Sequence, residues 1–295
     1  MKIVIYGAGA VGSLFGAYLS RKYDVALIGR KDHVNAINLH GLEIRGKTEG
    51  IFNIKAMENY DGGADVIFLT TKSYDTENAM KMLKDTIKNE IIISLQNGLD
   101  NIDIIKKYYD RKIAAGITTE GIIFESPGKI IHTGKGFTKL GNIKNVDRKI
   151  LNDILDSLKY SGMNAEYSEN IEMEIWKKGL VNGCINPLTA IMGIKNGELL
   201  KDPISRVFEK VCEEIQELAE YMNIHNDVLS MSKDVAINTA DNYSSMLQDI
   251  MKGKRTEIDH ITGIILLRAK NYKLEMKLNE SLYYLVKYLE GKHDK

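Results

Sequence analysis

The sequence predicts an α/β protein with a parallel sheet in its first part and helices alone in its second part. Short apolar strands alternate with helical stretches, and the clearest strands cover residues 2–6, 24–29, 65–70, 91–95 and 113–117. Apolar strands in such an alternation indicate a doubly wound sheet of the Rossmann type, with helices on both faces. From Ser168 onward the apolar residues follow helical periodicity. A chain of 295 residues is long enough for two domains.

A glycine-rich motif follows the first strand directly, in the order Gly7, Ala8, Gly9, Ala10, Val11 and Gly12. The spacing Gly-x-Gly-x-x-Gly, placed between a strand and a helical stretch over residues 13–22, is typical of dinucleotide binding. In this motif the first glycine permits a tight turn and the second lets phosphates approach the backbone. The third lets helix and strand pack closely. We therefore expect a dinucleotide site at this turn.

Composition excludes several classes of partner and site. Lys+Arg and Asp+Glu both number 40, so the net charge is zero and neither a nucleic acid nor a membrane is expected as partner. Cys184, Cys212 and the six histidines lack metal-type spacing, so no metal site is expected. The uncharged run over residues 3–20 is broken by glycines and preceded by Lys2 alone, which argues against a leader or a membrane span. These features predict a soluble, cytoplasmic protein.

The residue after the second strand bears on the choice of cofactor. Many NAD-selective proteins carry a carboxylate near this position, where it binds the ribose 2′-hydroxyl. This chain carries Arg30 instead, and a guanidinium can bind a 2′-phosphate through charge-assisted hydrogen bonds. NADP(H) is therefore expected rather than NAD(H), with a solvated basic turn as the alternative.

Lys72, Asn97 and Gly121 follow later strands of the predicted sheet. Ligands of doubly wound sheets bind beyond the carboxyl ends of the strands, so these three residues are expected at the nucleotide site. Lys72 and Asn97 could instead be ordinary loop residues, but their repeated placement at strand ends favours the nucleotide site.

Residues 121–142 predict three short antiparallel strands joined by tight turns. A helix over about residues 147–160 and a strand near Ala165 complete the first domain, which gives domains of residues 1–167 and 168–295.

The second domain is predicted to be helical throughout. The sequence indicates a long helix over residues 171–192 that is interrupted at Pro187. A second helix begins at Asp202-Pro203, with Asp202 as its N-cap. Helical periodicity continues to Glu220 and recurs over residues 256–270 and 279–290.

The long helix carries a polar stripe in apolar surroundings. Lys178, Asn182 and Asn186 are spaced i, i+4 and i+8, which drifts about 40° per step around a helix. Buried polar groups need partners, and asparagine is a poor helix former, so the stripe indicates a binding site. The alternative is a solvated helix face.

Several motifs together resemble those of ketopantoate reductases. Residues 176–190 (WKKGLVNGCINPLTA) are similar to one signature of that family, and residues 244–249 (SSMLQD) with 256–259 (TEID) are similar to another. The glycine motif, Ile28-Gly29-Arg30, Thr71-Lys72-Ser73-Tyr74-Asp75 and Leu95-Gln96-Asn97-Gly98 fall in the expected order. The resemblance spans nearly the whole chain. It implies NADPH-dependent reduction of 2-dehydropantoate to (R)-pantoate, a step toward pantothenate and coenzyme A.

The resemblance also assigns roles to individual residues. It makes Lys178 the proton donor and Glu257 a catalytic residue where substrate and cofactor meet. It implies substrate contacts for Asn97, Asn182, Asn186, Asn196 and Ser245. It implies nucleotide contacts for the glycine motif, Arg30, Lys72, Asn97 and Gly121. The chain departs from the family pattern at Asp100, where members often have glycine, and at Asp75, where some have glutamine.

The chemistry is consistent with this assignment. Hydride transfer to a ketone leaves negative charge on oxygen, which a positioned Lys178 can stabilise and protonate. Burial would lower the pKa of Lys178 and a nearby carboxylate would oppose that shift. Thr256 is expected to be an N-cap, so the helix dipole would favour an ionised Glu257.

Two other functions stay open, namely an NADP-linked reductase of another small 2-oxo acid and a non-catalytic NADP-sensing protein. A homodimer through the helical domain also stays open, because no sequence feature determines the oligomeric state.

Overall fold

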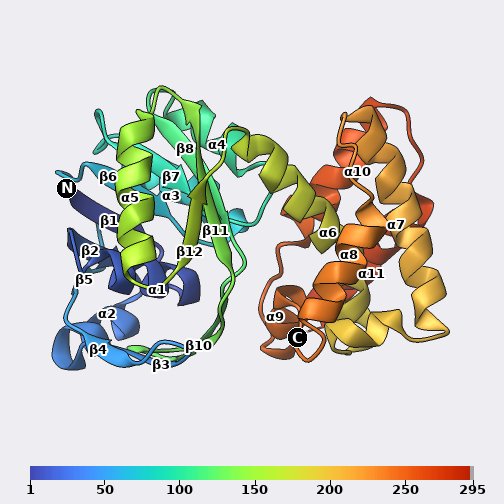
Figure 1. The fold of residues 1–295 in the computed structure, drawn as a ribbon, viewed down its shortest axis with the longest axis horizontal. Coiled ribbons are helices and arrows are strands. Elements are labelled where there is room, and N and C mark those ends of the chain that lie inside the picture. Colours follow the sequence, from blue (N-terminus) through green and yellow to red (C-terminus); the bar gives the residue numbers. More distant parts are fainter. Residues whose placement is uncertain (293–295) are drawn as a thin grey trace. The chain divides into compact units, whose positions relative to one another are not determined.

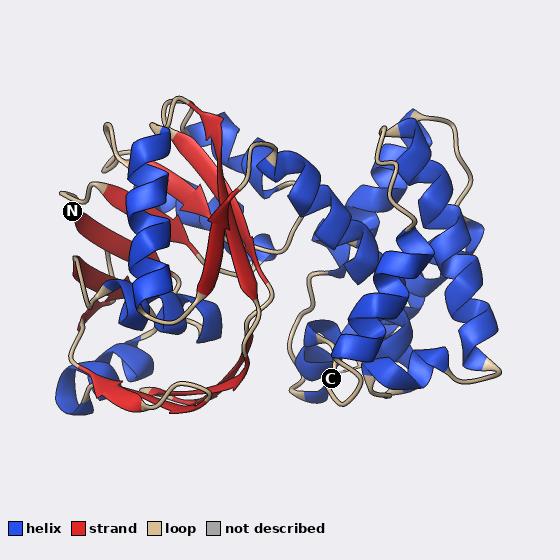
Figure 2. Cartoon of the chain, viewed as in Figure 1, coloured by secondary structure: helices blue, strands red, loops and turns tan. Residues whose placement is uncertain are grey.

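The computed structural model describes residues 1–292, which form two compact units. The N-terminal unit comprises Met1–Gln96 and Asn101–Glu174, and the helical unit comprises Asn97–Asp100 and the chain from Ile175 onward. All strands of the described chain lie in the N-terminal unit (Figure 2). The α/β fold class is therefore confirmed. The domain boundary predicted between Tyr167 and Ser168 lies before the long helix, whereas the structure divides the chain within that helix.

The main sheet of the N-terminal unit has eight strands in the order β12-β11-β8-β7-β6-β1-β2-β5. Their bounds are β1 (Lys2–Tyr6), β2 (Asp24–Ile28), β5 (Lys55–Met57), β6 (Val66–Leu69), β7 (Ile91–Ser94), β8 (Ile113–Thr118), β11 (Phe137–Lys144) and β12 (Asn164–Tyr167). All neighbouring pairs are parallel except β8 and β11, which are antiparallel. The central strands β6 and β7 are buried along their whole length, which explains their uninterrupted apolar sequences.

Helices cover both faces of this sheet, with α5 in front of the strands and α3 behind them in Figure 1. The helices of the unit are α1 (Ala10–Leu19), α2 (Lys31–His40), α3 (Thr76–Leu83), α4 (Asn101–Tyr108) and α5 (Arg148–Tyr160). Helix α1 begins within the glycine motif at Ala10, earlier than the predicted helical stretch over residues 13–22. Its side of the core includes Phe15, which lies 6.3 Å from Phe68 between ring centroids. Helix α5 begins where predicted, because the Asp147 side chain accepts a hydrogen bond from the Lys149 amide.

A second sheet of four strands has the order β4-β3-β10-β9. It consists of β3 (Leu42–Gly46), β4 (Gly50–Phe52), β9 (Gly121–Ser126) and β10 (Lys129–Gly134). The predicted antiparallel pairing of β9 with β10 is confirmed. The prediction that β11 continues this sheet is wrong, because β11 pairs with β8 in the main sheet and β10 pairs in parallel with β3. These partners are distant in sequence, so the local turns that guided the prediction carry no information about them.

The helical unit is built around α6 (Ile171–Met192), whose middle part carries the predicted polar stripe. The other helices are α7 (Ile204–Tyr221), α8 (Val228–Asn238), α9 (Ser245–Met251), α10 (Thr262–Asn271) and α11 (Lys277–Gly291). Single turns of 3-10 helix occur at η1 (Ser73–Asp75) in the N-terminal unit and at η2 (Asn196–Leu200) and η3 (Ile258–His260) in the helical unit. Helix α7 buries a regular apolar face, and its Glu214 carboxylate caps α11 by accepting the amides of Leu278 and Asn279.

Helix α6 runs through Pro187, so the predicted interruption there is wrong. A proline inside a helix removes one amide donor and crowds the carbonyl four residues earlier. That carbonyl belongs to Gly183. Beyond the proline, the Thr189 hydroxyl donates to the carbonyls of Ile185 and Asn186, which adds hydrogen bonds to the helix backbone beside the proline.

One predicted N-cap and one predicted helix start are also wrong. Asp202 does not cap α7, because Pro203 occupies the N-cap position and the Asp202 carboxylate accepts hydrogen bonds from the Arg206 guanidinium instead. The segment after Thr256 is not α-helical at first, since α10 begins only at Thr262. Glu257 is the N-cap of the short η3 turn, so the helix-dipole argument for its ionisation does not apply.

No helix among residues 1–292 combines the length and the apolar character that crossing a bilayer requires.

Candidate active site

The glycine motif forms a compact turn against two neighbouring strands of the main sheet. The amides of Gly7 and Ala8 both donate to the carbonyl of Ile28 at the end of β2, at 3.0 and 2.8 Å. The hydroxyl of Thr70, which follows β6, donates to the Gly7 carbonyl at 2.7 Å. The turn therefore lies at the carboxyl ends of β1, β2 and β6, where ligands of doubly wound sheets bind.

Each glycine of the motif meets a different spatial requirement. Gly7 has φ of +114°, and a Cβ there would lie 2.6 Å from the Thr71 amide nitrogen. At Gly12 a Cβ would collide with the Gly7 carbonyl and the Thr70 hydroxyl. At Gly9, by contrast, no protein atom lies within 4 Å of the Cβ position. Gly7 and Gly12 are thus required by the fold itself, whereas Gly9 borders open space.

The open space at Gly9 lies at the start of α1. Gly9 is the N-cap of this helix and makes no side-chain hydrogen bond, so the amides of the first turn remain available to an anion. A side chain at this position would fill the room that a phosphate needs. The residues present therefore fit a dinucleotide.

Arg30 lies beside this turn, as the sequence predicted for a cofactor-selecting residue. It is exposed and is the N-cap of α2. The preceding Gly29 approaches the glycine motif closely, since a Cβ on Gly29 would lie 3.0 Å from that of Ala8. Arg30 is therefore carried on a turn that contacts the glycine motif.

The other predicted nucleotide residues of this unit follow strands β6 and β8. Lys72 is partly buried and is the N-cap of η1, and Gly121 begins β9 in the smaller sheet. A Cβ on Gly121 would lie 2.8 Å from the Thr133 hydroxyl, so this glycine also has a packing role.

A buried amide that the sequence analysis did not assign organises the loops after β6 and β7. Gln96 donates through its side-chain nitrogen to the Thr71 carbonyl at 3.0 Å and to the Thr76 hydroxyl at 2.6 Å. The Thr76 hydroxyl in turn donates to Asn101 at 2.7 Å. In the sequence, this role could have been recognised from a polar residue placed directly after an apolar strand.

In the helical unit, the polar stripe of α6 begins at the half-buried Lys178. Its ammonium donates to the Asn97 side-chain oxygen at 2.8 Å. Burial lowers the pKa of Lys178 to about 8, and the negative charge of Glu257 opposes this shift. The structure therefore brings together the predicted proton donor, Asn97 and Glu257.

Two glycines of α6 allow other side chains to approach the stripe. A Cβ on Gly179 would collide with Leu99, and one on Gly183 would lie 2.6 Å from the terminal carbon of Ile265. Both glycines lie between residues of the polar stripe, so neighbouring side chains pack closely against α6 along the stripe. Asn182 is partly buried and Asn186 is 5% exposed, which contradicts the alternative of a solvated helix face.

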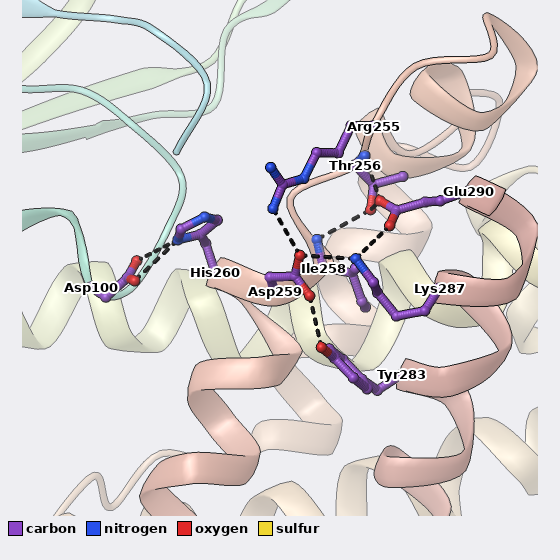
Figure 3. A network of polar contacts seen from close by, with 9 residues as sticks. All are labelled: Asp100, Arg255, Thr256, Ile258, Asp259, His260, Tyr283, Lys287 and Glu290. Carbon is purple, nitrogen blue, oxygen red and sulfur yellow. Dashed lines mark hydrogen bonds and ion pairs between the residues drawn. The ribbon is translucent and has the colours of Figure 1, made fainter. Parts of the chain in front are cut away.

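The segment that carries Glu257 is held by a network from α11 (Figure 3). The Glu290 carboxylate accepts both the amide and the hydroxyl of Thr256 at 2.7 Å. The Asp259 carboxylate accepts hydrogen bonds from Tyr283 at 2.7 Å and from Lys287 at 3.0 Å. Burial, with the Asp259 contact, raises the pKa of Tyr283 to about 12, so this phenol stays a donor at neutral pH. The sequence analysis assigned none of these α11 residues.

The remaining predicted substrate residues differ in their surroundings. Asn196 is buried, its amide nitrogen donates to Thr239 at 2.9 Å, and its side-chain oxygen has no hydrogen-bond partner among the described residues. Ser245 is exposed as the first residue of α9, while the neighbouring Ser244 is buried as the N-cap of that helix.

Among residues 1–292 no group of His, Cys, Asp and Glu side chains could hold a metal ion. Cys184 and Cys212 are both free and buried. Three histidines have specific partners that the sequence did not indicate. His33 contacts Ser13, His132 contacts Glu120 and His260 contacts Asp100.

The chain is similar to known proteins along nearly its whole length. The ketopantoate reductase PanE/ApbA family matches residues 3–145, and the ketopantoate reductase PanE/ApbA C-terminal family matches residues 170–290. A 2-dehydropantoate 2-reductase of Pyrococcus horikoshii is 40% identical over 99% of this chain and 98% of its own length. The 2-dehydropantoate 2-reductase of Bacillus subtilis is 32% identical over 100% and 99% of the respective chains.

Two solved structures share the fold over the full length of both chains. A PanE/ApbA family ketopantoate reductase from Ralstonia eutropha has a TM-score of 0.92 at 29% identity and covers 100% of each chain. D-mandelate dehydrogenase, solved with NADH and anilino(oxo)acetate, has a TM-score of 0.90 at 30% identity and also covers 100% of each chain.

Substitutions at Gly9 and Gly12 should separate an effect on ligand binding from an effect on stability. Gly9→Ala should leave the melting temperature unchanged and weaken dinucleotide binding, because the methyl group meets no protein atom but occupies the anion space. Gly12→Ala should destabilise the protein by about 1–3 kcal/mol, because the methyl group has no room. Calorimetry without ligand and fluorescence titration with dinucleotide measure the two effects. Equal effects of the two changes on stability would contradict the prediction.

Proposed function

Because the chain belongs to the ketopantoate reductase family, we propose that it reduces 2-dehydropantoate to (R)-pantoate with NADPH. The observation that carries the proposal is the state of Lys178. An ammonium whose pKa burial lowers to about 8 can donate a proton near neutral pH far more readily than an exposed lysine.

The reaction requires a hydride at the ketone carbon and a proton at its oxygen. The bound nicotinamide supplies the hydride. Lys178 stabilises the negative charge that develops on the oxygen and transfers its proton from Nζ, after which the neutral amine is reprotonated from solvent. Asn97 orients the ammonium through its hydrogen bond, and Glu257 favours the charged form of Lys178 between turnovers.

The other predicted residues have compatible roles in substrate binding. The amides of Asn182 and Asn186 can hold the substrate carboxylate without adding full charge. Asn196 is proposed as a further substrate residue because it matches the family pattern; it is buried, and its side-chain nitrogen donates to Thr239. Ser245, at the exposed start of α9, can donate to the substrate from the outer side.

NADPH is proposed on the strength of Arg30. The exposed guanidinium lies on the turn that contacts the phosphate loop, and Gly7–Gly12 with Lys72 and Gly121 complete the proposed nucleotide site. In a cell the reaction would take place in the cytoplasm and lead toward pantothenate and coenzyme A.

A second candidate is the reduction of another 2-oxo acid. D-mandelate dehydrogenase shares the fold at a TM-score of 0.90 and was solved with NADH and anilino(oxo)acetate, which carries an aromatic group. The relatives at 32–40% identity over nearly the full length are 2-dehydropantoate 2-reductases, which supports 2-dehydropantoate as the first candidate substrate.

The decisive experiment follows NADPH oxidation through the loss of absorbance at about 340 nm, where the reduced nicotinamide absorbs. The purified protein is given 2-dehydropantoate and a panel of aliphatic and aryl 2-oxo acids, each also with NADH. Highest kcat/KM for 2-dehydropantoate with NADPH is expected. Preference for an aryl substrate would favour the second candidate, and no turnover with any substrate would indicate a nucleotide-binding protein without this activity.

Arg30→Ala should weaken NADPH binding by roughly 10–100-fold, because charge-assisted hydrogen bonds contribute about 1.5–3 kcal/mol. NADH binding should be unchanged, since NADH has no 2′-phosphate. Lys22→Ala is the matched control, because Lys22 is an exposed cation before the opposite end of β2. Equal loss of both cofactors in Arg30→Ala would contradict selection by this residue.

Lys178→Ala should lower kcat by about 10²–10⁴-fold while NADPH affinity is nearly retained, because a positioned general acid contributes that much. Lys177→Ala, one residue earlier on α6, is the control and should keep kcat. Ser245→Ala should mainly raise KM for the oxo acid. Unchanged turnover in Lys178→Ala would exclude Lys178 as the acid.

The pH profile of reduction should report Lys178. Because the protonated form is the proton donor, kcat/KM should fall as the pH rises through about 8. Glu257 raises the pKa of Lys178, so Glu257→Gln should move the falling limb to lower pH, whatever its effect on the maximal rate. Stopped assays between about pH 6 and pH 10 measure the falling limb of kcat/KM, because this range spans about two units on each side of the expected pKa. A shift to higher pH would contradict the prediction.

A further inference from the structure

The segment Asn97–Asp100 attaches to the helical unit although the residues on both sides of it belong to the N-terminal unit. It presents Asn97 to Lys178. Its Leu99 amide donates to the His260 carbonyl at 2.9 Å, and the Leu99 side chain lies against Gly179 on α6. The position of Asn97 therefore depends on how firmly the rest of this segment is held.

Asp100 and His260 make the polar side-chain contact that closes the segment (Figure 3). The two carboxylate oxygens of Asp100 lie 2.9 and 3.0 Å from Nδ1 of His260. The side chains are only 16% exposed at His260 and 21% at Asp100, so solvent screens this pair much less than a surface ion pair.

His260 is also tied to the backbone of Glu257. Its amide donates to the Glu257 carbonyl at 3.1 Å, and the Ile261 amide donates to the same carbonyl at 3.0 Å. His260 thus connects the segment of Asn97 with the segment of Glu257, the two groups that act on Lys178.

We propose that Asp100 and His260 are positioning residues that hold Asn97 against the Lys178 ammonium, by fastening its segment to the one that carries Glu257. The role deepens the proposed function, because it rests on Lys178 as the proton donor. In the segment that carries Glu257 and His260, the other charged side chains have partners of their own. Asp259 binds Arg255 and, from α11, Lys287 and Tyr283, so the segment stays attached when the Asp100 contact is removed.

The test compares His260→Ala with His260→Asn, whose amide nitrogen can take the place of Nδ1 as donor to Asp100. His225→Ala is the matched control, because His225 is exposed in the same unit. Two readouts are measured on the full chain. One is kcat and KM for reduction. The other is the rate of acetylation of Lys178 against pH by mass spectrometry, with Lys177 as the internal reference, and this readout needs no turnover.

His260→Ala should lower kcat by about tenfold with KM nearly kept, because a small displacement of a reacting group is costly. The midpoint of Lys178 acetylation should move to higher pH, since water that enters relieves the burial that dominates its pKa. His260→Asn and His225→Ala should resemble the unchanged protein in both readouts.

The proposal is overturned if His260→Ala keeps both kcat and the acetylation midpoint, or if His260→Asn is as defective as His260→Ala. If His260→Ala does not fold, Asp100→Ala is judged by the same two readouts. Should the unchanged protein fail to reduce any oxo acid, the proposed function is lost, while the acetylation midpoints still decide whether Asp100 and His260 position Lys178.

Discussion

The enclosure of the Lys178 ammonium is the constraint on which the arrangement of the helical unit depends. An ammonium removed from water loses hydration, and its pKa of about 8 reflects that loss against the opposing charge of Glu257. A charged group in such a place needs nearby acceptors, and Asn97 provides one at 2.8 Å. Two segments distant in sequence, residues 97–100 and 255–261, must therefore both be held near the middle of α6.

Polar contacts hold the second of these segments in addition to the burial of Ile258 and Ile261. Its residues before α10 form only a short 3-10 turn, so backbone groups near Glu257 need partners from outside a helix. Glu290 supplies one to the Thr256 amide, and Asp259 accepts from two groups of α11. Isolated surface pairs contribute little to stability, but partly buried and mutually connected groups restrict each other's positions. The last described helix of the chain is thus a support for the candidate catalytic carboxylate.

The N-terminal unit meets a different requirement, which is free space. Gly7 and Gly12 are needed because the turn and the close packing of α1 leave no room for a Cβ, whereas Gly9 leaves room that the protein does not use. The same sequence motif therefore contains two glycines that the fold requires and one that borders open space. The exposed Arg30 follows Gly29, which approaches Ala8 of this motif closely.

The sequence by itself determined the strands and helices with strong local patterns, such as β6, β7, α5 and α6, and the candidate chemistry of the glycine motif and the Lys178 stripe. It did not determine the pairing of β10 with β3, the continuity of α6 through Pro187 or the non-helical start at Thr256. Only the tertiary structure placed Asn97 against Lys178 and Asp100 against His260. Periodicity and capping are local in the chain, whereas these contacts join residues far apart in sequence, and their geometry exists only after the core has packed.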